Sequence, residues 1–101
     1  MPLAAVALIW AAGAAAQDDA SAPPGRQVFQ SAEPACAICH ILEDAGAKGR
    51  VGPSLDSLQP SAEQVRSAVR EGPGTMPSYA DRLSQDQIDA LAEYVAGAAG
   101  Q

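Results

Sequence analysis

The chain is poor in the side chains that most often bind metals or perform acid–base chemistry. Its 101 residues include one histidine, two cysteines and two methionines. A structural zinc site takes four ligands, so a carboxylate would have to complete one here. The sequence contains no alternating run of β-branched residues, which argues against strands. It also contains no internal repeat. The chain has six basic and twelve acidic residues, and its net charge of −6 argues against nucleic acid or an anionic membrane as a partner.

An apolar stretch of small residues fills positions 1–16 and ends in three alanines. This pattern is typical of a secretory signal peptide, so we expect cleavage near Ala16 and a periplasmic protein. An uncleaved anchor is the alternative, although the stretch is shorter than the roughly 20 residues of a membrane span. No Lys or Arg precedes the apolar run, so the signal is atypical or the true start lies upstream. Residues 17–24 predict a flexible tail, and residues 25–101 predict one small domain.

The most specific motif is Cys36-Ala37-Ile38-Cys39-His40. This spacing is typical of covalent haem attachment, with one thioether from each cysteine and His40 under the iron. A thioredoxin-type redox pair is the first alternative, but the βαβ pattern expected around it is missing. A disulfide between Cys36 and Cys39 would close only a very short loop and add little stability. The motif therefore predicts haem c, with zinc, redox and disulfide interpretations as weaker alternatives.

Three helices account for most of the expected structure, which makes the chain all-α. Residues 24–30 form the beginning of the first helix. The second and third begin with Ser-x-x-Gln capping boxes at residues 61–64 and 84–87, each followed by apolar residues at helical spacing. Gly72-Pro73 should end the second helix and Gly97 the third. Residues 43–57 are rich in Gly, Asp, Ser and Pro and predict a loop.

A second iron ligand has one strong candidate. Met76 lies in a loop rich in glycine and proline, where the backbone can approach a cofactor closely, and His/Met ligation is found in cytochromes c. A core-filling role is the alternative for a methionine, and Lys48 is a weaker competing donor. An iron-bound imidazole usually donates its second N–H to a carbonyl, and the rigid Gly52-Pro53 segment is suited to provide one.

With these elements in this order, residues 25–96 resemble the class I cytochromes c. The resemblance implies their fold, three main helices with loops around one haem. It also implies that Gly25 and Phe29 cross the last helix near Tyr94, and that the Pro53 carbonyl accepts from His40. The region around the motif and the Met76 loop are similar to the small monohaem subunits of periplasmic sulfite dehydrogenases. No tryptophan remains after the signal to contact a propionate; the candidates for that contact are Tyr79, Arg50 and Arg82.

The resemblance implies an electron-transfer protein and not an enzyme. We expect a periplasmic one-electron carrier or, alternatively, the dedicated electron-accepting subunit of a dehydrogenase such as a sulfite dehydrogenase. Its redox partners should have a basic docking surface, and a ring of acids is expected around the exposed haem edge. No stable membrane insertion is expected once the signal is removed.

Overall fold

The computed structural model describes residues 22–101. The predicted signal peptide and residues 17–21 of the predicted tail lie outside the described residues. Helix α1 (Pro24–Ser31) begins at the last residue of that tail, with prolines at its start, where the missing backbone N–H costs no hydrogen bond.

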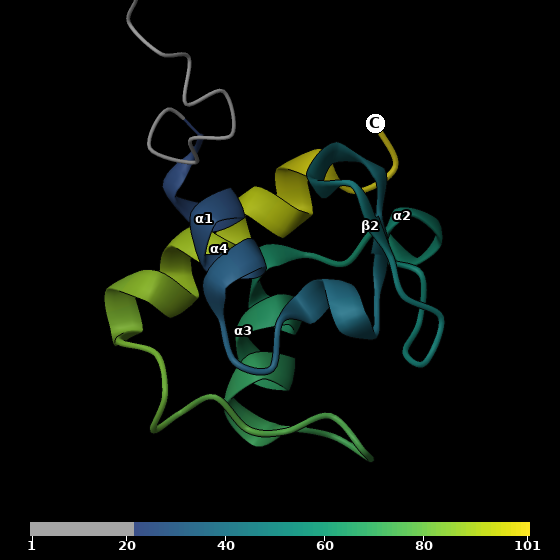
Figure 1. Cartoon of the computed structure of the whole chain (residues 1–101). Helices are drawn as coiled ribbons and strands as arrows, with labels where there is room; N and C mark the ends of the chain where they lie inside the picture. Colours follow the sequence, from purple (N-terminus) through teal and green to yellow (C-terminus); the bar gives the residue numbers. More distant parts are fainter. Residues whose placement is uncertain (1–21) are drawn as a thin grey trace, which may run out of the picture.

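The first and last helices cross each other at close range. Helix α4 (Gln85–Ala98) packs against α1, and Figure 1 shows the two crossing near the N-terminus of the described chain. A Cβ on Gly25 would lie 2.1 Å from the Ala90 carbonyl oxygen, so only glycine fits at this point. Phe29 and Tyr94 meet edge to face, with ring centroids 6.3 Å apart. The expected crossing is confirmed.

Helix α3 (Ala62–Glu71) lies beside α4 and completes the helical framework. Both predicted capping boxes are present: the Ser61 and Ser84 hydroxyls accept from backbone N–H groups, and the glutamine side chains accept from the serine N–H groups. Helix α3 ends at Gly72, whose φ of 63° favours glycine. Salt bridges also join α3 to α4, since Arg66 pairs with Asp89 at 3.0 Å and with Glu93 at 2.9 Å.

The region predicted as a loop contains short regular elements. Strands β1 (Ile41–Leu42) and β2 (Ala47–Lys48) form an antiparallel pair around the 3-10 turn η3 (Glu43–Ala45). Helix α2 (Leu55–Leu58) is a single turn capped by the Ser54 side chain. The prediction of a plain loop was therefore wrong here, because elements this short carry no hydrophobic period.

The end of α4 also differs from the prediction. The helix runs through Gly97 to Ala98, and the left-handed conformation falls on Gly100, at φ 78°. A side chain at position 97 would contact nothing within 4 Å, so the helix passes this exposed glycine without a packing constraint. No helix within residues 22–101 is long and apolar enough to cross a membrane.

The predicted apolar faces of the helices form the buried core. Every apolar residue expected at helical spacing in α4 is buried: Ile88, Leu91, Ala92 and Val95. They meet Phe29 from α1 and Val65 and Val69 from α3. The fold is mostly helical, as predicted.

Candidate functional site

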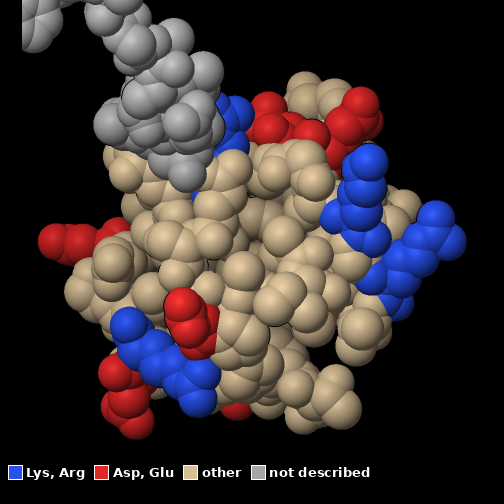
Figure 2. All heavy atoms as spheres, viewed as in Figure 1, with Lys and Arg blue, Asp and Glu red and all other residues tan. Residues whose placement is uncertain are grey.

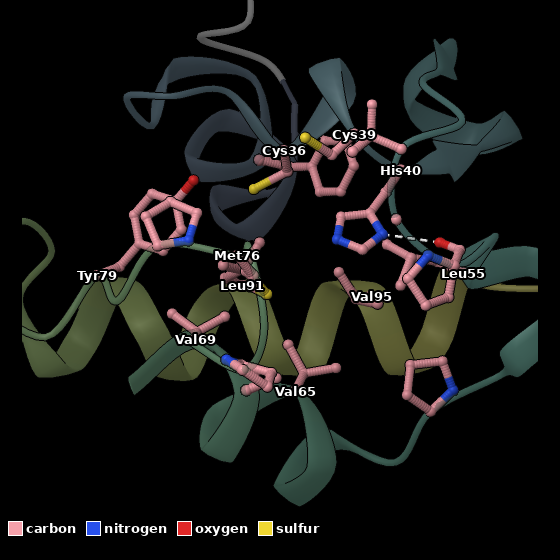
Figure 3. A pocket seen from close by; sticks show the side chains of 18 of the residues that line it. Cys36, Cys39, His40, Leu55, Val65, Val69, Met76, Tyr79, Leu91 and Val95 are labelled. Carbon is pink, nitrogen blue, oxygen red and sulfur yellow. Dashed lines mark hydrogen bonds between the residues drawn. The ribbon is translucent and has the colours of Figure 1, made fainter. Parts of the chain in front are cut away.

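A large cavity lies between α3, α4 and the segment that carries the cysteine motif. Its volume is about 620 Å³, within the range of small-molecule and cofactor sites. Figure 3 shows side chains of the cysteine motif, α3, α4 and the Met76 loop around it. The predicted site residues all line it: Cys36, Cys39, His40, Pro53 and Met76.

The cysteine motif is held in a tight turn. The 3-10 turn η2 (Cys36–Ile38) continues into His40, whose backbone N–H donates to the Cys36 carbonyl at 3.0 Å. Both cysteines are free and half-buried. Burial raises the pKa of the Cys36 thiol to about 11. Within residues 22–101 no three His, Cys, Asp or Glu side chains are grouped to hold a metal ion.

The His40 imidazole is fixed from two directions. Its Nδ1 lies 2.7 Å from the Pro53 carbonyl oxygen, a contact drawn as a dashed line in Figure 3. This contact leaves Nε2 available to a ligand. The Gly52 backbone runs directly against the ring, because a Cβ there would lie 2.6 Å from His40 Cε1. The Gly52 N–H also donates to the Cys39 carbonyl at 2.7 Å. The Gly52-Pro53 segment thus packs against the imidazole and accepts from it.

Met76 reaches the cavity from the loop that follows α3. The Met76 N–H donates to the Pro73 carbonyl at 3.1 Å, which closes a turn. The loop then folds back onto the end of α3, where a Cβ on Gly72 would lie 2.7 Å from the Met76 carbonyl oxygen. The Ser78 hydroxyl donates to the Arg70 carbonyl at 2.6 Å. These contacts present the Met76 thioether to the cavity at a defined position.

The walls of the cavity are apolar. Phe29, Leu91 and Val95 combine their helix-packing role with cavity lining, and among residues 22–101 no Asp, Glu, Lys or Arg lines the cavity. On the face drawn in Figure 2, acidic and basic side chains lie in small groups beside one another. Lys48, the competing ligand, is exposed in β2 and does not line the cavity.

Some lining residues had not been assigned to the site from the sequence. Gln64 and Thr75 contribute polar groups, and Val51 and Leu58 line the cavity while staying 74% and 58% exposed. Gln64 was recognised only as a capping residue. Thr75 could have been predicted from the sequence, because it directly precedes Met76.

Two of the candidates for a propionate contact also donate to backbone carbonyls before the cysteine motif. The Tyr79 hydroxyl donates to the Pro34 carbonyl at 2.5 Å, and Arg82 donates to the Glu33 carbonyl at 2.8 Å. Arg50 is exposed and does not line the cavity.

Comparison with known proteins identifies the family. Residues 20–95 match the family model described as cytochrome c oxidase, cbb3-type, subunit III. The chain belongs to the cytochrome c family. Its architecture is that of a class I monohaem cytochrome c, and the family is one of electron-transfer proteins rather than enzymes.

Individual relatives agree with this assignment. The crystal structure of the c-type cytochrome SorU from Sinorhizobium meliloti superposes with a TM-score of 0.75 and 48% identity, over 77% of this chain and 90% of that one. Chloroplastic cytochrome c6 from Chlamydomonas reinhardtii is 36% identical over 93 residues, 82% of this chain. The chain spans only 58% of that algal protein. Cytochrome c6 from Leptolyngbya boryana is 32% identical over 75% of this chain and 91% of its own length.

The residues of the cavity suit the cofactor of this family, haem c. A flat apolar macrocycle requires apolar walls, its attachment requires two thiols, and its iron requires an imidazole of fixed tautomer. The cavity provides all three, together with a thioether from the Met76 loop. Haem c is therefore the cofactor that this cytochrome is expected to carry.

Proposed function

We propose that this cytochrome is a periplasmic one-electron carrier with a single haem c. Cys36 and Cys39 attach the haem covalently, and His40 and Met76 are the axial ligands of its iron. Pro53 orients His40 and raises its basicity because the Pro53 carbonyl accepts a hydrogen bond from the Nδ1–H group. With His40 and Met76 both holding its iron, the haem would supply one-electron redox chemistry without binding substrate.

The observation that carries the proposal is the common cavity of the four side chains. The two thiols and the imidazole come from residues 36–40, the thioether comes from the loop after α3, and all four line one apolar space. Apolar surroundings and a thioether ligand both favour the reduced iron, which raises the potential. These residues therefore suit an electron carrier whose reduction potential is set by the burial of the haem and by the ligands of its iron.

We also propose a redox partner with a basic docking surface. The net charge of −6 supports attraction to such a partner over distance. The contact itself would be apolar at the cavity mouth, where Val51 and Leu58 are exposed. Electron-transfer encounters of this kind are small and transient. A periplasmic location follows from the predicted signal peptide.

Substituting the thioether tests the ligand assignment. Met76→Ala should remove the methionine–iron absorption of the ferric protein and lower the reduction potential, because the sixth position opens to water. The matched control is Thr75→Ala, which alters the neighbouring lining residue without touching a proposed ligand. A Met76→Ala protein with the spectrum and potential of the wild type would refute the assignment.

A dedicated subunit of a periplasmic dehydrogenase is the second candidate. The resemblance to the small monohaem subunits of sulfite dehydrogenases supports it, and so do the exposed Val51 and Leu58 side chains, which a permanent partner would bury. Purification under native conditions separates the two functions. A stable complex with one dehydrogenase favours the subunit, whereas a free monomer favours the carrier.

A further inference from the structure

The loop that carries Met76 is attached to the rest of the protein on two sides. On one side it is bonded to α3, where the Tyr79 N–H donates to the Val69 carbonyl at 2.8 Å and the Ser78 hydroxyl donates to the Arg70 carbonyl at 2.6 Å. These bonds hold the loop to the helix that precedes it. They do not fix its distance from the opposite wall of the cavity, which carries the cysteines.

Two hydrogen bonds connect the loop to that opposite wall. The Tyr79 hydroxyl donates to the Pro34 carbonyl at 2.5 Å, and Arg82 Nη1 donates to the Glu33 carbonyl at 2.8 Å. Both acceptors lie directly before the cysteine motif. Pro34 and Tyr79 themselves line the cavity, so the first bond is part of its wall.

The Tyr79 hydroxyl does more than fill space. Tyr79 is only 3% exposed, and a buried hydroxyl is costly unless it finds a partner. A phenylalanine at this position would fill the same volume without needing one. The hydroxyl instead reaches the wall that carries the cysteines, and Arg82 strengthens the connection from the surface.

We propose that Tyr79 is a positioning residue that clamps the Met76 loop to the segment before Cys36 and so holds the Met76 thioether in place. Arg82 is the second member of the clamp. This inference rests on the proposed axial role of Met76. It predicts that loosening the clamp lets an added ligand compete with Met76 for the iron. Attachment of the haem through Cys36 and Cys39 should stay intact.

The experiment measures imidazole binding to the ferric holoprotein. Tyr79→Phe removes one hydroxyl and should increase imidazole affinity roughly five- to tenfold, the effect of one net hydrogen bond. Arg82→Met removes the exposed bond and should increase it about two- to threefold. Tyr94→Phe is the matched control, because the Tyr94 hydroxyl donates to Asp44, whose side chain does not line the cavity.

The outcomes distinguish the clamp from the ligand assignment. Increased affinity in Tyr79→Phe and Arg82→Met, with Tyr94→Phe unchanged, supports the clamp. Affinity within about twofold of wild type in Tyr79→Phe, or an equal increase in Tyr94→Phe, overturns it. A wild-type ferric protein without methionine–iron absorption would refute the axial role of Met76 and the clamp together, so the spectrum of the wild type is recorded first.

Discussion

The contact between Gly52 and His40 gives a sharp test of how the imidazole is held. A Cβ at position 52 would lie 2.6 Å from Cε1, 2.9 Å from Nδ1 and 3.1 Å from Nε2 of His40. The Gly52 backbone cannot easily move away, because its N–H donates to the Cys39 carbonyl at 2.7 Å. In Gly52→Ala the ring must therefore tilt.

The expected loss follows from two contributions. Overpacking of a tight site costs about 1–3 kcal/mol. The tilt also stretches the contact between Nδ1 and the Pro53 oxygen, now 2.7 Å, and one weakened hydrogen bond costs about 1 kcal/mol. Together the free energy of unfolding should fall by roughly 2–4 kcal/mol. The reduction potential should rise, because a less basic imidazole stabilises the ferric iron less well.

The assay is urea unfolding of the holoprotein, with the potential measured on the same samples. Gly97→Ala is the control, since a Cβ there meets nothing within 4 Å. In a helix interior this change should raise stability by about 0.5–1 kcal/mol and leave the potential unchanged. A Gly52→Ala protein with the unfolding midpoint and potential of the wild type would show that Gly52 does not constrain His40.

Two further predictions concern the framework around the site. Gly25→Ala places a Cβ 2.1 Å from the Ala90 carbonyl oxygen, so urea unfolding should show a loss of about 3 kcal/mol or more, and an unchanged midpoint would contradict the tight crossing of α1 and α4. Asp56→Asn removes a carboxylate that accepts from the Gly100 and Glu43 backbone N–H groups, which lower its pKa. Because the folded pKa lies below the unfolded one, the stabilisation is present above about pH 4 and is lost as the pH falls through the folded pKa. The gap between the urea midpoints of wild type and Asp56→Asn should therefore be present near pH 7 and shrink as the pH falls below about 4, and a gap independent of pH would contradict it.

The parts of the fold visible in the sequence are those with local signals. Capping boxes at Ser61 and Ser84 specify the start of a helix through side chains three residues apart, so the sequence alone locates them. The apolar period of α4 likewise identifies its buried face. The strand pair and α2 were missed because two to four residues carry no period, and their hydrogen bonds depend on the surrounding chain.

In the site, too, some features can be predicted from the sequence and others cannot. Cys36, Cys39, His40 and Met76 could be selected from the sequence because the chain offers so few alternatives of each chemical type. The contacts of Tyr79 with Pro34 and of Arg82 with Glu33 join segments far apart in the chain, and no local pattern predicts such pairs.

The central claim is a covalently attached haem whose iron is ligated by His40 and Met76 and which carries one electron. A potentiometric titration of the purified holoprotein, followed by absorption, tests it most directly. The account predicts a single reversible one-electron transition and, in the ferric form, the absorption of a methionine–iron bond. A protein that shows no haem spectrum, or a ferric haem without that absorption, would contradict it.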